Sequence, residues 1–258
     1  GMGVSVADLA NGGAKSIAIG NFSGEPMSLY TQAGKQAFID RAGAMRLANP
    51  TVAVLTFGVM FADMDLDGYD DLLAANGHIE PDIAAVREGW TFAQPVQLFL
   101  NDGGKRLVEV TDRLGDAFRR PMVGRALAVA DIDGDGDLDV LVGANGGRPR
   151  LIRNDSTGKA HLVRVRLTGV PPNREAIGAR LRAVVGSRRL TRFVTTGGSY
   201  LSQSELTVTF GLGEAKQVDR LTVRWPDGSE ETFPSLAADH LYRIEQGRGI
   251  VGRTPLRR

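Results

Sequence analysis

One plan recurs three times in the amino-terminal part of the chain: an apolar alternating segment, a loop that begins with Asp, a second apolar segment, and then Asn. Apolar residues in these segments repeat with a period of two, which is typical of strands and excludes helical solenoids. A further pattern of strand, turn and strand follows each copy. The three copies are residues 3–21, 58–77 and 125–146, and the patterns that follow them are 28–40, 97–110 and 150–165.

Four strands in a unit of about 50 residues predict a β-propeller blade. We therefore expect propeller-type repeats over residues 1–158, with blades at about 1–45, 51–115 and 120–158. The stretch 78–95 interrupts the second repeat, and we expect a short helix at 82–88 within it.

Residues after 158 follow a different pattern. Short alternating segments are separated by turn signals such as Pro226-Asp227-Gly228, which predicts a small β-sandwich over 159–247 and a tail over 248–258. The charge also changes sign: residues 1–160 hold 15 Lys and Arg against 21 Asp and Glu, whereas residues 161–258 hold 16 against 9. The predicted fold class is all-β, with three propeller-type blades followed by a sandwich.

Composition excludes several classes of protein. The chain has no Cys, so it has no disulfide, catalytic thiol or Cys-ligated zinc. It has no apolar run long enough for a membrane-spanning helix, and its first residues lack the features of a signal peptide. We expect the basic surplus after residue 160 to be a solvated face and predict no nucleic-acid partner.

Two of the three repeats carry a dense series of carboxylates. Loops 63–71 and 131–139 place Asp at positions one, three, five and nine and Gly at position six. A hard cation such as Ca²⁺ takes six to eight oxygen ligands, and alternate side chains of a tight loop supply several of them. We predict one Ca²⁺ in each loop. The predicted ligands are the carboxylates of Asp63, Asp65, Asp67 and Asp71 with the carbonyl of Tyr69, and those of Asp131, Asp133, Asp135 and Asp139 with the carbonyl of Asp137.

The alternatives for these loops fit less well. An EF-hand needs an acidic residue at position twelve and flanking helices, but position twelve is Ala74 or Val142 and the flanks alternate like strands. A solvated acidic turn would leave four repelling carboxylates close together. The first repeat keeps Asp8 but lacks the later carboxylates, so we predict that loop 8–16 binds no metal.

With their flanking strands, loops 63–71 and 131–139 resemble the FG-GAP/VCBS repeats of integrin α-like propellers. Residues 161–246 resemble the ASPIC/UnbV domain through GGSYLSQSE (197–205) and FGLGEAKQVDRLTVRWPDGS (210–229). This order is that of the cartilage acidic protein family and its bacterial relatives. The resemblance implies Ca²⁺ in the loops, a seven-bladed propeller, an extracellular or periplasmic location and no established catalysis. Three blades cannot close such a ring, so we expect a fragment of a longer protein, which would account for the missing signal peptide.

The favoured function is a non-enzymatic scaffold or adhesion-type module for a protein or carbohydrate partner. No G-x-S-x-G, P-loop or dinucleotide motif stands in a suitable context. The alternative is an enzyme or accessory protein acting on polysaccharide or, as the resemblance implies, in enediyne-type biosynthesis. Two smaller candidates are His78 with Glu80 and Asp82, and the hydroxyl-rich segment 197–204, for which packing and turn stabilisation are the favoured roles.

Overall fold

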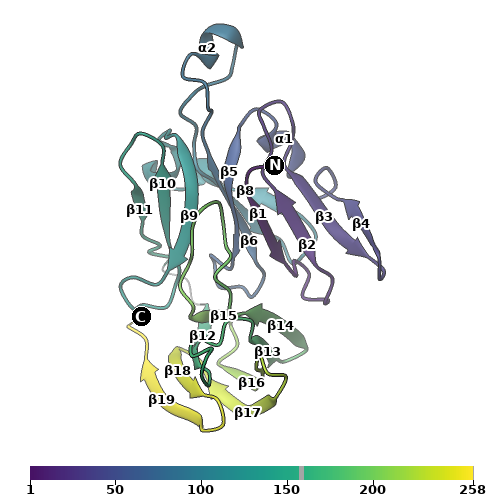
Figure 1. The fold of residues 1–258 in the computed structure, drawn as a ribbon, viewed down its shortest axis with the longest axis vertical. Coiled ribbons are helices and arrows are strands. Elements are labelled where there is room, and N and C mark those ends of the chain that lie inside the picture. The colour runs from purple at the N-terminus through teal and green to yellow at the C-terminus, as the bar shows by residue number, and fades with distance from the viewer. Residues whose placement is uncertain (157–159, 258) are drawn as a thin grey trace.

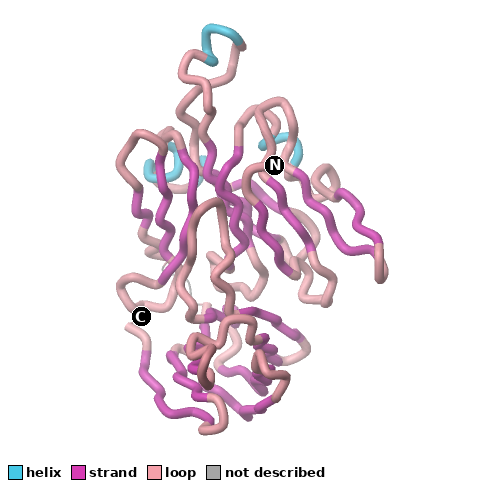
Figure 2. The backbone as a smooth tube through the Cα atoms, viewed as in Figure 1, coloured by secondary structure: helices cyan, strands magenta, loops and turns pink. Residues whose placement is uncertain are grey.

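The computed structural model describes residues 1–156 and 160–257, and this part of the chain is all-β. Its strands form five small sheets in an arrangement of the β-propeller type (Figures 1 and 2). The sequence predicted three blades and one sandwich, so the number of blades predicted does not match the number of sheets. Self-comparison of the sequence detects only the segments that carry an Asp loop, and the last two sheets have none.

The first two sheets are four-stranded meanders in which each strand pairs antiparallel with the next. They fall within the ranges predicted for the first two blades. The first contains β1 (Val4–Ala7), β2 (Ser16–Ile19), β3 (Ser28–Ala33) and β4 (Ala37–Asp40); the second contains β5 (Thr56–Ala62), β6 (Asp71–Asn76), β7 (Gln97–Asn101) and β8 (Leu107–Glu109).

The third sheet has three strands, β9 (Gly124–Ala130), β10 (Asp139–Ala144) and β11 (Arg150–Ile152). The segment predicted to pair after residues 150–152 is β12 (His161–Thr168), but β12 belongs to another sheet. Strand β12 joins that sheet because its apolar side chains, Val163, Val165 and Leu167, are buried in the core of the carboxy-terminal part. The expectation of a fourth strand in the third repeat is therefore wrong for the described residues.

The second sheet lies between the first and the third, and it is buried on both faces. Leu72 and Ala74 of β6 pack into the core shared with the first sheet, whereas Leu73 and Ala75 pack into the core shared with the third. Alternate side chains of a strand point to opposite faces, so β6 contributes to two cores at once. Figure 1 shows these three sheets side by side in the upper part of the molecule.

Two further sheets are formed by residues 161–255, and no described strand before β12 takes part in them. They share one hydrophobic core, which includes Phe210 and Trp225. One sheet has the order β15 (Val208–Gly213), β12, β18 (His240–Glu245) and β19 (Gly249–Pro255); the other has β14 (Arg188–Phe193), β13 (Arg180–Val185), β16 (Gln217–Arg224) and β17 (Glu230–Ala237).

Strand β19 corrects the expectation of a tail over 248–258. Residues 249–255 pair antiparallel with β18 at the edge of the sheet. Glycine and proline weaken the sequence signal of a strand, but both are tolerated at an edge, where one side of the backbone needs no partner.

The helices are single turns: α1 (Ala48–Thr51), α2 (Ile83–Val86), the 3₁₀ turn η1 (Thr111–Arg113) and α3 (Asp116–Arg119). The turn α2 lies within the helix predicted at 82–88, at the tip of the 78–95 insertion that projects beyond the sheets (Figure 1).

Candidate metal centres

Both Asp-rich loops lie at the end of a hairpin. Loop 63–71 joins β5 to β6, and loop 131–139 joins β9 to β10. Gly68 and Gly136 have φ values of 94° and 104°, which is the left-handed region that favours glycine. A Cβ at Gly68 would also lie 2.9 Å from the carbonyl oxygen of Gly211. The glycine at position six is thus required by the turn and, in the first of these loops, by the close approach of the carboxy-terminal part.

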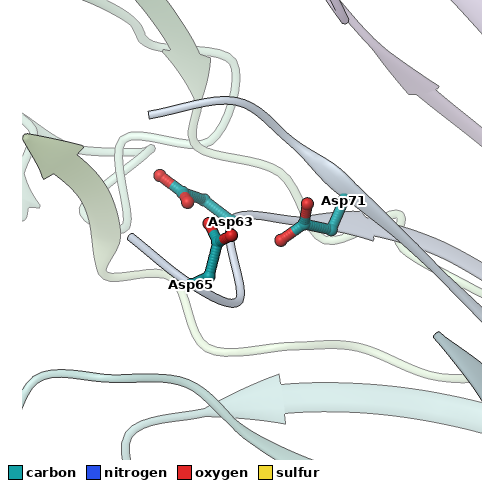
Figure 3. A group of neighbouring side chains, drawn as sticks. All are labelled: Asp63, Asp65 and Asp71. Carbon is teal, nitrogen blue, oxygen red and sulfur yellow. The ribbon is translucent and has the colours of Figure 1, made fainter. Parts of the chain in front are cut away.

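The structure brings together three of the four predicted carboxylates in each loop. One oxygen each from Asp63, Asp65 and Asp71 lie within 4.8 Å of one another (Figure 3), and Asp131, Asp133 and Asp139 form an equivalent group. The carboxylates at position five lie outside these groups and accept hydrogen bonds from the backbone N–H two residues later. These bonds join Asp67 to Tyr69 (2.8 Å) and Asp135 to Asp137 (3.1 Å).

The ninth-position carboxylates also hold the loops in place. Asp71 accepts hydrogen bonds from the backbone N–H of Met64 and of Asn101, each at 2.8 Å. Asp139 repeats this arrangement with Ile132 at 2.9 Å and Asn154 at 2.8 Å. Each of these aspartates therefore ties the start of its own loop to a segment further along the chain.

Burial makes the charge of these groups unfavourable. Asp63 is 3 % exposed and Asp71 is fully buried. Burial raises the pKa of Asp63 to about 8, against the opposing effect of Arg192, and raises the pKa of Asp71 well above its usual value. In the second loop, burial and the nearby Asp135 raise the pKa of Asp137 to about 8. Within the described residues, Asp63 Oδ1 and Asp137 Oδ1 are buried without a hydrogen-bond partner.

The carboxy-terminal part contacts both loops, which the sequence did not reveal. Gly211 N donates to Asp63 Oδ2 (3.1 Å), and Arg192 pairs with the buried Asp70 (2.9 Å). In the second loop, Arg164 Nη1 lies 2.5 Å from Asp131 Oδ2, and Arg164 also pairs with Glu205. The sequence signal was only a surplus of arginine after residue 160, because these partners lie 33 to 148 residues apart.

Loop 8–16 is built differently. The Asp8 carboxylate accepts hydrogen bonds from the backbone N–H of Gly12 (3.1 Å) and Gly13 (2.6 Å). The expectation that this loop binds no metal remains a prediction.

The two smaller candidates have structural contacts. Ser202 Oγ donates to the carbonyl of Leu127 (2.6 Å) and Ser204 Oγ accepts from Val129 N (3.0 Å), so this segment is anchored on β9. The buried His78 ring packs against Phe22, and its Nδ1 accepts from Glu80 N (3.0 Å).

Comparison with known families matches three stretches of the chain. Residues 169–251 match the ASPIC and UnbV model, residues 123–163 match the FG-GAP repeat, and residues 76–142 match an FG-GAP-like repeat. Loop 131–139 lies within both repeat matches. These matches identify FG-GAP-type repeats within residues 76–163 and an ASPIC/UnbV segment at 169–251. The family resemblance predicted from the sequence is thereby confirmed.

Curated relatives of this chain include Cartilage acidic protein 1. The protein from Homo sapiens is 30 % identical over 239 residues, which cover 88 % of this chain and 33 % of the relative. The protein from Mus musculus is 31 % identical over 240 residues, with 88 % and 34 % covered. The chain thus spans about a third of the length of the curated relatives it matches. Among its described residues, no helix is long and apolar enough to cross a membrane.

Proposed function

We propose that this chain is an extracellular or periplasmic binding scaffold for a protein or carbohydrate partner, and that loops 63–71 and 131–139 each hold one Ca²⁺. The FG-GAP repeats, the ASPIC/UnbV domain and the relatives support the scaffold role. The observation that carries the metal is Asp63, whose buried carboxylate lies beside Asp65 and Asp71 with one oxygen lacking a partner. A cation would supply the missing charge and the missing contact.

The donors fit calcium better than other metals. Every grouped donor is a carboxylate oxygen, which suits a hard cation, and calcium accepts irregular coordination whereas magnesium requires a near-octahedral shell. Asp63, Asp65 and Asp71 would hold one ion, with Asp67 and the Tyr69 carbonyl completing the set. Asp131, Asp133 and Asp139 would hold the other, with Asp135 and the Asp137 carbonyl. Each ion would stabilise the end of a hairpin, which makes its role structural.

Calorimetric titration of chelator-stripped protein with calcium should show two sites. Replacing Asp65 by asparagine should remove one of them, because this exposed ligand can be altered without disturbing the core. The matched control is Asp116→Asn, which changes a side chain that is 91 % exposed and far from either loop in the sequence. Saturating calcium should raise the free energy of unfolding by about 2.7 kcal/mol per site at a hundredfold excess over Kd. Absence of binding at millimolar calcium, or a preference for magnesium, would contradict the proposal.

Metal-free protein should lose stability as the pH rises from about 4 to about 8. The folded pKa values of Asp63 and Asp137 are about 8, above the ordinary value of 3.8, so the folded state binds more protons than the unfolded state in this window. Each such group lowers the free energy of unfolding by up to about 1.4 kcal/mol per pH unit. Calcium binds ionised carboxylates, so calcium binding near pH 6.5 should release protons from the aspartates. Denaturant unfolding against pH, and titrations in buffers of different ionisation enthalpy, measure the two effects; a flat profile without metal would refute this account.

We also propose that the chain has two folding units, the repeats over 1–158 and a sandwich-like unit that begins near 159 and, with β19, ends near 255. Support comes from the core shared by β12–β18, from the pairing of β19 with β18, and from the ASPIC/UnbV match.

A polypeptide of residues 159–258 should therefore fold on its own. Trp225 is the single tryptophan of this segment and is 2 % exposed, so its fluorescence reports the core directly. We expect blue-shifted emission and one cooperative unfolding transition. Red-shifted emission without a transition would show that the repeats are needed for folding.

A further inference from the structure

Strands β14, β13 and β16 present an arginine-rich face to the outside of their sheet. Leu181, Ala183 and Val185 of β13 point into the core, so the alternate residues of the strand point away from it. The pairing register aligns the outward residues in rows. One row is Phe193, Arg180, Arg224; the next is Thr191, Arg182, Thr222; and the third is Arg189, Val184, Arg220. We call Arg180, Arg182, Arg189, Arg220 and Arg224 the arginine face.

The arginine face has one acidic cross-strand neighbour, Glu230 of β17, which lies opposite Arg224 and favours the charged form of Arg180, so the five arginines keep a surplus of positive charge. Within the described part of the chain, none of its five guanidinium groups forms an ion pair or donates a hydrogen bond, and Arg180 Nε is buried without a partner. By contrast, Arg164, Arg166, Arg192 and Arg248 of the same unit all pair with carboxylates. Arg180 and Arg224 stand directly opposite each other, and like charges in that position are destabilising. An external anion would relieve this repulsion.

The shape of the surroundings suits an extended ligand. Arg180, Arg182 and Phe193 line one wall of a cavity of about 910 Å³, whose other wall includes residues of β1. The arginine face continues from this wall across β16, where Arg220 and Arg224 are exposed. Rows lie about 7 Å apart along the strands and the strands about 4.8 Å apart, so the positive charges are regularly spaced over the sheet.

We propose that the arginine face binds an acidic polysaccharide, a polymer that carries carboxylate or sulfate groups at regular intervals. Guanidinium groups bind both anions through paired hydrogen bonds, and Thr191 and Thr222 place hydroxyl groups between the arginines for sugar hydroxyls. Nucleic acid fits less well: a flat sheet does not enter a duplex groove, and single strands need several stacking aromatics where this face has Phe193 alone. The inference rests on the proposed scaffold role and names the partner class.

The test uses the full chain with four labelled probes: heparin, polygalacturonate, neutral dextran and duplex DNA. Fluorescence anisotropy should show binding of heparin or polygalacturonate that weakens as salt increases, and no binding of dextran. A variant with Arg180→Gln, Arg182→Gln, Arg220→Gln and Arg224→Gln should bind at least about tenfold more weakly, because four exposed ion pairs are lost. The matched control removes the same charge elsewhere, through Arg87→Gln, Arg106→Gln, Arg119→Gln and Arg248→Gln, and should change the affinity less than about threefold.

Three outcomes would overturn the proposal: no binding of either acidic polysaccharide, equal weakening in the face variant and the control, or tighter binding of DNA than of both polysaccharides. The double variant Arg182→Gln, Arg220→Gln, which alters two exposed side chains, repeats the comparison if the fourfold variant does not fold. Calcium-dependent melting of the same preparations separates the two claims. If calcium raises the melting temperature while no polysaccharide binds, the calcium scaffold stands and the arginine face is wrong.

Discussion

Replacing Asp71 by alanine should lower the free energy of unfolding by about 3–5 kcal/mol, measured by denaturant unfolding in the presence of a chelator. The carboxylate is fully buried and accepts hydrogen bonds from the backbone of Met64 and of Asn101. Alanine would leave both N–H groups buried without partners, at one end of the loop and in the neighbouring strand β7. Because the chelator removes metal, this loss contains no contribution from a bound ion.

Asp102→Ala is the control for this substitution. Asp102 lies in the turn that follows β7 and forms an exposed pair with Arg106 four residues later, so its loss should change stability by less than about 0.5 kcal/mol. Asp71→Asn keeps one acceptor oxygen and should fall between the two. If Asp71→Ala proved as mild as Asp102→Ala, the ninth-position carboxylate would not be what holds the loop in the absence of metal.

Replacing Arg164 by methionine should also lower stability by about 3–5 kcal/mol without metal. The Arg164 side chain is 6 % exposed and is paired with the fully buried carboxylate side chain of Asp131 and with Glu205. Methionine leaves two acidic groups without their cation. In saturating calcium the loss should be smaller, because Asp131 Oδ2 becomes free to bind the ion and one of the two calcium sites should bind more tightly.

Arg166→Met provides the comparison for Arg164→Met. Arg166 lies on the same strand, but its pair with Glu175 is exposed, so the change should stay within about 1 kcal/mol. Unfolding of both variants with chelator and with calcium gives the four values required. An equal loss for Arg164→Met in both conditions would mean that Asp131 does not exchange its arginine for metal.

The Asp loops could be predicted from the sequence because the information is local. The spacing of Asp63, Asp65 and Asp71 within nine residues, between two segments of period two, predicts a hairpin end with converging carboxylates, and the structure groups these three. The strands of the first two repeats were predictable for the same reason, since the alternation that marks them is the alternation that fills the two cores.

Other features depend on contacts between distant segments. The sequence around Asp131 gives no sign of its ion pair with Arg164, and the sequence around Asp63 gives no sign of its hydrogen bond with Gly211. Both contacts depend on how the carboxy-terminal sheets pack against the repeats. Strand β12 was predicted by its pattern, but its assignment to a sheet depended on which core received Val163 and Val165. The edge strand β19 was missed because its glycines and proline are signals of irregular structure.

Strand β6 has consequences for how this sequence can change. Its six residues are all buried, with Leu72 and Ala74 facing one neighbouring sheet and Leu73 and Ala75 facing the other. A strand with one solvent-exposed face accepts polar residues at every second position. Inserting one residue turns the side chains that follow it to the opposite face of the sheet. In β6 neither face is exposed to solvent, and one residue inserted before Leu73 would move this leucine into the other core, at the position that Ala74 occupies. The central sheet should therefore tolerate substitutions and insertions mainly outside its strands, in the turns and in the 78–95 insertion.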